Sequence, residues 1–204
     1  MADVGVRAAR HDDVAAVAST QIRAWKYGYR DFLPEGPLEQ MTGAAAEDLW
    51  RRQWDEAIVS PPSRRHRVLV AVEKVVLDTD AFPALGPGGI AAAAAALQGS
   101  ERVVGLASHA PAEDPDLDPT TTGELLTFLV DPDHIRRGHG SRLLNATVDH
   151  FREDGYRTIV TWAFADNHAV LGFLESAGWG EDGAERVLHI GRTVRMVRLA
   201  TDIS

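Results

Sequence analysis

Residues 130–144 read VDPDHIRRGHGSRLL, and this stretch decides how the rest of the 204-residue chain is interpreted. Before it, Glu124–Val130 is almost entirely apolar, which is typical of a central buried strand. After it, apolar side chains recur at helical spacing from Ser141 to Asp154. Gly138 and Gly140 stand in between; they let a ligand approach the backbone, and the amides at a helix start carry partial positive charge. The stretch therefore predicts a strand, a loop that suits a phosphate, and a helix.

The charge balance of the chain favours a local anion site. The sequence holds 30 Asp and Glu against 21 Lys and Arg, a net charge of −9. Proteins that bind nucleic acid or anionic membranes rely on clustered basic residues, so neither partner is expected. Arg136, Arg137 and Arg142 concentrate positive charge at the loop. We therefore expect any anionic ligand to bind there.

Two common phosphate-binding motifs do not fit this loop. A Walker loop requires GxxxxGK[ST], and the segment has no lysine; the dinucleotide fingerprint requires a third glycine where Leu143 stands. The loop alone is equally compatible with a plain helix start that contains two turn glycines. The chain has no cysteine, and its 8 histidines follow no HxH or HExxH spacing. No metal cofactor and no cysteine nucleophile are therefore expected.

The remaining sequence predicts one domain over residues 1–204. His11-Asp12-Asp13 is expected to cap a helix that stops near Gly28, and Thr42 a helix over 44–58. Residues 111–122 read as an exposed acidic loop, and residues 77–100 as an insertion of uncertain structure. Another helix should run from the Asp166-Asn167 cap to 177. Besides 124–130, strands are expected at 67–73, 102–108, 158–163, 186–190 and 193–199.

The start of the chain lacks the basic residues and apolar run of a signal peptide, and no stretch approaches the roughly 20 apolar residues of a membrane span. We therefore expect a soluble cytoplasmic protein without membrane association.

Several segments together resemble the GNAT acetyltransferase family. They are the strand ending in V-x-P, the loop R-G-x-G, the amphipathic helix, the strand TIVTWA, and Asn167 followed by Phe173 and Gly178-Trp179. Residues 22–40 resemble the first helix pair of many members, and the closing strands also resemble the family. The resemblance implies an α/β (α+β) fold with a mixed, mostly antiparallel central sheet flanked by helices. It also implies that a splayed strand pair forms an acetyl-CoA cleft.

By that resemblance, acetyl-CoA is the co-substrate and binds between the strands at 124–130 and 158–163. The residues implied in its binding are Phe128, Leu129, Val130, Arg136, Arg137, Gly138, His139, Gly140, Ser141, Arg142, Asn167 and Phe173. The chain departs from the family pattern at two places. Ile135 stands where the loop usually begins with Gln or Arg, and Leu174 stands where many members place a tyrosine as general acid.

Glu124 is the candidate general base. It precedes Gly138 by 14 residues, the spacing of the glutamate base in histone-acetylating members of the family. Burial in a strand would raise the pKa of its carboxyl toward the useful range. The alternative is a solvated residue at a strand end. Trp25, Tyr27, Tyr29 and Asp31 fall where the family walls its acceptor pocket, with helix-packing core as the alternative.

Three functional hypotheses remain, and one of them is a scaffold in which the fold serves only assembly. The first is an acetyl-CoA-dependent N-acetyltransferase that transfers the acetyl group directly to an amine of a small molecule or peptide. The second is a catalytically weak GNAT-fold protein that binds an acyl-CoA as a sensor or regulator, motivated by Ile135 and Leu174. A homodimer is also a hypothesis, because the regular last strand could pair across a two-fold axis.

Overall fold

The computed structural model describes residues 4–75 and 100–204, and nearly all of the insertion expected at 77–100 lies outside these ranges. The centre of the described structure is a seven-stranded sheet in the order β1-β2-β3-β4-β5-β7-β6. Only the neighbours β4 and β5 run parallel; the other pairs are antiparallel. The strands are β1 (Val4–Ala8), β2 (Arg67–Lys74), β3 (Glu101–Pro111), β4 (Thr122–Val130), β5 (Thr158–Phe164), β6 (Gly180–His189) and β7 (Thr193–Asp202).

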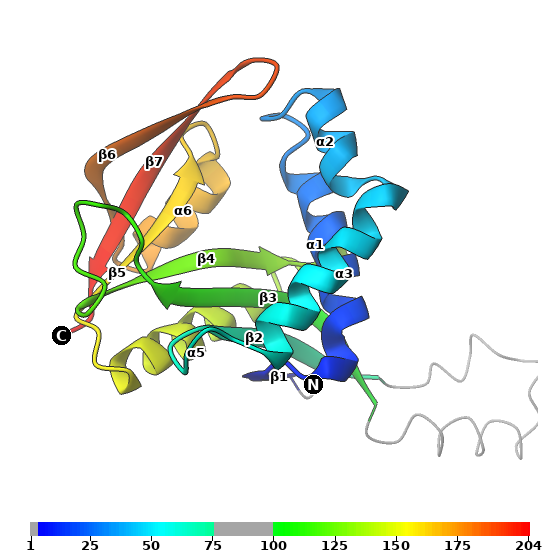
Figure 1. The fold of residues 1–204 in the computed structure, drawn as a ribbon, viewed down its shortest axis with the longest axis horizontal. Helices are drawn as coiled ribbons and strands as arrows, with labels where there is room; N and C mark the ends of the chain where they lie inside the picture. Colours follow the sequence, from blue (N-terminus) through cyan, green and yellow to red (C-terminus); the bar gives the residue numbers. More distant parts are fainter. Residues whose placement is uncertain (1–3, 76–99) are drawn as a thin grey trace, which may run out of the picture.

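Helices cover both faces of the sheet (Figure 1). One face carries α1 (Val14–Gly28), α2 (Glu35–Thr42) and α3 (Ala44–Val59), and Val17 of α1 and Trp54 of α3 pack there on β2 and β3. The other face carries α5 (His139–Glu153) and α6 (His168–Ser176). The mixed, mostly antiparallel sheet with flanking helices confirms the expected fold class.

The helix α5 is fixed to the sheet by the apolar stripe that the sequence predicted. Leu143 and Phe151 have no exposed surface and pack with Leu125 of β4 and Ile159 of β5. Burying each of these side chains contributes about 1.5–3 kcal/mol. Gly155 ends the helix with φ +82°, a left-handed conformation that glycine adopts without steric cost. This anchoring fixes where the N-terminus of α5, and hence the loop before it, lies.

The N-terminal third differs from the prediction in three ways. Residues 4–8, for which no element was predicted, form the strand β1, which pairs with β2. A separate helix, α2, precedes α3. Thr42 does not cap α3: it is the last residue of α2, its hydroxyl donates to the carbonyl of Leu38 (2.8 Å), and Gly43 is the N-cap. The prediction failed because threonine can also hydrogen-bond back into the preceding turn.

The segment 112–121 is a mostly exposed acidic loop, as predicted, but Asp114 within it is only 9% exposed and binds arginines of β6 and β7. One further prediction is wrong. The last strand β7 lies between β5 and β6, so both of its edges are already paired. It therefore cannot pair with a second copy across a two-fold axis.

Three short elements complete the described chain. The 3₁₀ turns are η1 (His11–Asp13), directly before α1, and η3 (Pro132–His134), directly after β4. Gly191, with φ +79°, lies in the turn that joins β6 to β7, as the sequence predicted. Within residues 4–75 and 100–204, every helix is too short or too polar to cross a membrane.

Candidate functional site

The parallel strands β4 and β5 separate soon after they meet. Among the residues that the structure describes, their pairing covers Thr122–Glu124 of β4 and Thr158–Val160 of β5. At the point of separation, the hydroxyl of Thr161 donates to the carbonyl of Leu125 (2.8 Å). The remainder of β4, up to Val130, keeps its pairing with β3 on the opposite edge. The splayed strand pair that the sequence suggested is therefore present.

The peptide groups of β4 show what this opening offers. The amide of Asp131, directly after the strand, donates to the carbonyl of Val104 on the β3 side (2.9 Å). Successive residues of a strand direct their N–H and C=O groups to opposite edges. The N–H and C=O groups of Phe128 and Val130 therefore point away from β3. An extended ligand chain with amide groups could pair with them as an added strand.

A bulge in β4 sets which face each side chain of this strand occupies. Opposite β3, Thr127 pairs with Ser108 and Leu125 with His109, so Leu126 is an extra residue. One extra residue reverses the alternation of side chains that follow it. Leu125 and Phe128, three residues apart, consequently both pack on the α5 face. Glu124 points to the opposite face, the one that α1 and α3 cover.

Three of the predicted cofactor-binding residues meet beside the opening. Phe128 of β4 stacks on Phe173 of α6 with ring centroids 5.7 Å apart. A Cβ placed on Gly140 would lie 3.6 Å from the Phe173 ring and 3.7 Å from the Phe128 ring. Asn167 begins the same helix α6, where its side chain caps the helix by accepting from the amide of Val170 (3.3 Å). The fold thus brings β4, α5 and α6 together at one point.

The loop before α5 combines a strained backbone with exposed positive charge. Gly138 is the N-cap of α5 with φ +82°, and Arg136 also has a positive φ, 62°. The side chains of Arg136, Arg137 and Arg142 are exposed, and Arg142 Nη1 donates to the carbonyl of Arg137 (3.2 Å). Ser141 is exposed in the first turn of the helix. Amides at a helix start and exposed guanidinium groups around them suit an anion.

The side chain of His139 anchors this loop to β2. Its side chain is buried, and Nε2 lies 2.8 Å from Oε1 of Glu73 in β2. The other oxygen of Glu73 lies 3.6 Å from Nε2 of His134, a residue of η3. One carboxylate therefore holds two histidines, one on each side of the arginine loop. The imidazole of His139 cannot contact a ligand from this position, although its amide is part of the helix start.

Asp131 connects the loop to the opposite face of the sheet. Its carboxylate accepts from the Arg23 guanidinium of α1 (2.5 and 2.9 Å) and from the amide of Asp133 (3.0 Å). Burial acts to raise the pKa of Asp131, but these hydrogen bonds outweigh it and hold the pKa below its usual value. The carboxylate therefore stays ionised and ties α1 to the start of the loop.

The Glu124 carboxyl is buried, with 7% of the residue exposed. Burial, reinforced by the negative charge of Asp114, raises its pKa above the usual value, while the Arg186 guanidinium acts in the opposite direction. Glu124 lies beside Val160, at the point where β4 and β5 part. A buried carboxyl with a raised pKa is suited to accept a proton near neutral pH.

An ionic network lies next to Glu124 and fastens the β6–β7 hairpin to the loop 111–122. Arg198 donates to Asp114 (3.0 Å), to Asp116 (2.9 and 2.5 Å) and to Asp182 (2.7 Å). Asp114 also accepts from Arg186, whose guanidinium lies 3.9 Å from the centre of the Trp162 ring. Two acidic residues of this loop, Asp114 and Asp116, are thus paired with arginines of the hairpin.

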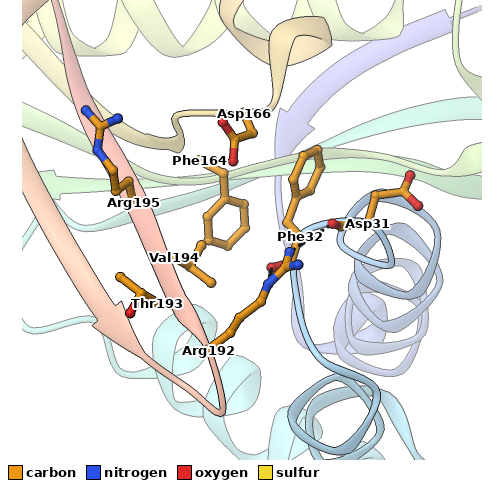
Figure 2. A pocket seen from close by; sticks show the side chains of 8 residues that line it. All are labelled: Asp31, Phe32, Phe164, Asp166, Arg192, Thr193, Val194 and Arg195. Carbon is orange, nitrogen blue, oxygen red and sulfur yellow. Dashed lines mark hydrogen bonds between the residues drawn. The ribbon is translucent and has the colours of Figure 1, made fainter.

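A cavity of about 240 Å³ lies on the same face as Glu124, where the α1–α2 connection approaches the β6–β7 turn (Figure 2). Figure 2 shows the rings of Phe32 and Phe164 along its sides, with Arg192 at one end and Asp166 at the other. The Arg192 guanidinium donates to the carbonyls of Asp31 (2.9 Å) and Phe32 (3.1 Å). The residues that line the cavity are Asp31, Phe32, Phe164, Asp166, Arg192, Thr193, Val194 and Arg195.

Of the four residues expected to wall an acceptor pocket, only Asp31 lines this cavity. Tyr29 lies behind it, packed edge-on against Phe164 (5.0 Å), and burial raises the pKa of Tyr29 to about 12. Trp25 packs on Tyr29 and Trp50, which agrees with the helix-packing alternative. Tyr27 is 48% exposed, and the Arg30 guanidinium lies 4.8 Å from the centre of its ring.

The other cavity residues were not found from the sequence. Phe164, Asp166 and Arg192 lie in segments that read simply as a strand end, a helix cap and a turn. No spacing pattern links them, because they approach one another only through the pairing of β5 with β7.

A comparison with protein families agrees with this geometry. The model of the acetyltransferase (GNAT) family matches residues 46–179, about two thirds of the chain. The chain belongs to the GNAT family. A search of curated proteins found no match.

Solved GNAT structures have the same fold as this chain. One is a protein from Salmonella typhimurium described as an acetyltransferase, solved with its cofactor acetyl-CoA; it is 18% identical, with a TM-score of 0.64, and the match covers 99% of this chain and 95% of that one. PaiA N-acetyltransferase from Thermoplasma acidophilum, in complex with coenzyme A, is 13% identical, with a TM-score of 0.66, and the match covers 98% of this chain and 99% of that one. The ribosomal-protein-S18-alanine N-acetyltransferase from Escherichia coli is 16% identical, with a TM-score of 0.56, and the match covers 98% of this chain and 94% of that one.

The two departures from the GNAT pattern have different surroundings. Leu174 is 3% exposed and packs in the core between α6 and the sheet, so the apolar side chain is used for packing. Ile135 is 41% exposed at the start of the loop, next to Arg136 and Arg137. Either arginine can extend toward an anion from the neighbouring positions.

Proposed function

We propose that this GNAT protein is an acetyl-CoA-dependent N-acetyltransferase that transfers the acetyl group directly to an amine of a small molecule or peptide. The observation that carries the proposal is the opening between β4 and β5, which leaves the peptide groups of Phe128 and Val130 facing the gap and ends at the arginine-rich start of α5. Two solved GNAT relatives of the same fold hold acetyl-CoA or coenzyme A.

The residues of the opening fit acetyl-CoA. The amides at the start of α5, with Arg136, Arg137 and Arg142, would hold the pyrophosphate, while the backbone of Phe128–Val130 would pair with the amides of the pantetheine arm. Gly140 leaves room beside Phe128 and Phe173 for that arm. Acetyl-CoA supplies the thioester, and the chain supplies binding, orientation and proton transfer.

Glu124 is the proposed general base. It accepts, directly or through one water, the proton that the neutral acceptor amine loses as its nitrogen forms the bond to the acetyl carbonyl carbon. The carbon–sulfur bond breaks, and the thiolate takes a proton from solvent. A thiol has a reference pKa near 8.5, which makes the thiolate a workable leaving group without a tyrosine acid. The absence of cysteine agrees with direct transfer.

Thermal unfolding and thiol release test this function. Acetyl-CoA at about 100 times its Kd should stabilise the protein by about 2.7 kcal/mol, seen as a rise in Tm. A panel of amines should then give thiol release that depends on the amine. Stabilisation without thiol release for any amine would support the sensor hypothesis, and no stabilisation at millimolar acetyl-CoA would contradict both.

A further inference from the structure

The acceptor cavity holds two opposite charges that the protein leaves without charged partners at hydrogen-bond distance. Across the part of the chain that the structure describes, no carboxylate lies within 4 Å of the Arg192 guanidinium, which is held by two backbone carbonyls instead. Arg195, on the same strand, is already paired with Glu185 (2.6 Å). A guanidinium fixed in place by carbonyls retains its charge and unused N–H groups for a ligand.

Asp166 provides the opposite charge. Within residues 4–75 and 100–204, its exposed carboxylate makes no ion pair within 4 Å. Figure 2 shows this carboxylate at the end of the cavity away from Arg192, above the Phe164 and Phe32 rings. Asp166 directly precedes Asn167, the cap of α6. The Asp166 end of the cavity is therefore the end nearer to α6 and the opening.

We propose that the acceptor is a free amino acid, whose carboxylate binds Arg192 and whose amino group lies at the Asp166 end. This inference rests on the proposed N-acetyltransferase function and chooses between its two acceptor classes. A residue at a peptide N-terminus carries an amide where the free amino acid carries a carboxylate, so it lacks the charge that Arg192 would bind. Phe32 and Phe164 line the sides of the cavity with apolar surface for a side chain.

The size of the cavity agrees with a small acceptor. Its volume, about 240 Å³, is below the roughly 300–1,000 Å³ of sites for drug-sized ligands. The stacked rings of Phe32 and Phe164, with centroids 5.7 Å apart, and the Arg192 contacts hold the cavity walls together. An acceptor with a carboxylate at one end and an amine at the other complements both charges at once, and this sets the direction in which it binds.

The test compares each amino acid with its own amide as acceptor in thiol-release assays. For the preferred side chain, kcat/KM should be about 10- to 100-fold higher for the acid, the usual effect of a hydrogen bond to a charged group. The Arg192→Gln variant should lose this preference, and Arg192→Lys should retain part of it. A merely structural role of Arg192 would lower activity toward acid and amide equally and leave their ratio unchanged.

Arg65→Gln is the matched control. Arg65 also donates to a backbone carbonyl, that of Asp154 (3.0 Å), but it lies in the connection before β2. This variant should keep the ratio of acid to amide. Calorimetric titration of the amino acid into the protein saturated with CoA gives a readout without turnover, and the binding should be lost in Arg192→Gln.

The two proposals fail in different ways. Equal kcat/KM for acids and amides, or an unchanged ratio in Arg192→Gln, would overturn the amino-acid inference while thiol release would still support N-acetyltransferase activity. If acetyl-CoA neither raises the Tm nor releases thiol with any amine, the proposed function itself is contradicted. Calorimetric binding of peptides with a free N-terminus, in preference to amino acids, would also contradict the inference.

Discussion

The proposed cofactor half and the proposed acceptor half of this protein are built in opposite ways. The proposed cofactor side comes mainly from one continuous segment, Phe128–Arg142, and it offers backbone amides and glycine backbone to the ligand. The acceptor cavity is assembled from the separate segments 31–32, 164–166 and 192–195, and it offers side chains. A site made of local backbone can be read from a sequence, whereas a site made of distant side chains cannot.

The difference also concerns what holds each half in place. The loop before α5 is held by Glu73 and Asp131, which bind its flanking residues from below. The hairpin that carries Arg192 is held by the ion pairs of Arg198 and by the Arg192 contacts to the α1–α2 connection. Cofactor binding should therefore be sensitive to changes in backbone conformation, and acceptor binding to changes in side-chain charge.

Glu124→Gln, between the two halves, should have the largest effect. Loss of a general base typically lowers kcat by about 10²- to 10⁴-fold, while the Kd of acetyl-CoA should not change because the loop is untouched. In the native protein, kcat/KM should rise with pH through the raised pKa of Glu124, and this rise should be absent in the variant. Unchanged kcat across the pH range would refute the assignment.

The stability of Glu124→Gln separates a catalytic role from a structural one. A carboxyl whose pKa is raised by folding stabilises the protein below its unfolded pKa and loses that contribution as the pH rises through the folded pKa. Ionisation of this carboxyl is therefore unfavourable in its buried site. The glutamine variant should have a Tm at least as high as that of the native protein.

Gly138→Val should weaken acetyl-CoA binding by about 10²-fold or more, because a branched side chain cannot adopt φ +82° without rearranging the start of α5. Its added Cβ would also lie 2.9 Å from Nη1 of Arg142. Calorimetric titration measures the Kd. Gly155→Val is the control, since Gly155 has the same φ at the opposite end of α5; it should lower Tm and leave the Kd unchanged. Equal Kd values for the two variants would contradict the backbone role of the loop.

Glu73→Ala should have the smallest effect, an increase of about tenfold in the Kd of acetyl-CoA, because the variant releases both His134 and His139 beneath the loop. Activity with S-acetylpantetheine, which lacks the pyrophosphate, should be unchanged. Glu101→Ala serves as control: Glu101 lies at the same end of the sheet but pairs with Arg7 (2.8 Å). A similar loss with both acetyl donors would indicate general damage to the fold.

The order of the elements around α5 could be predicted, and the reasons are local. Leu143 and Phe151 recur at helical spacing, Gly155 stops the helix, and Asn167 caps the next one. The strand β1 was not predicted, because Val4 and Val6 form only a short apolar pattern. The helix α2 was implied only by the resemblance of residues 22–40 to a first helix pair, and not by the residue pattern. Thr42 is a residue type that often caps the following helix, but here it is the last residue of α2 and donates to the carbonyl of Leu38.

The sequence by itself determined the fold class, the GNAT resemblance and the position of the loop rich in glycine and arginine, because periodicity, glycines and local charge are properties of neighbouring residues. Only the tertiary structure decided which face Glu124 occupies, since the bulge at Leu126 depends on the pairing with β3. It also decided that His139 is buried on Glu73 and that Asp166 and Arg192 share one cavity. These relations join residues far apart in the chain, and they exist only after the sheet has formed.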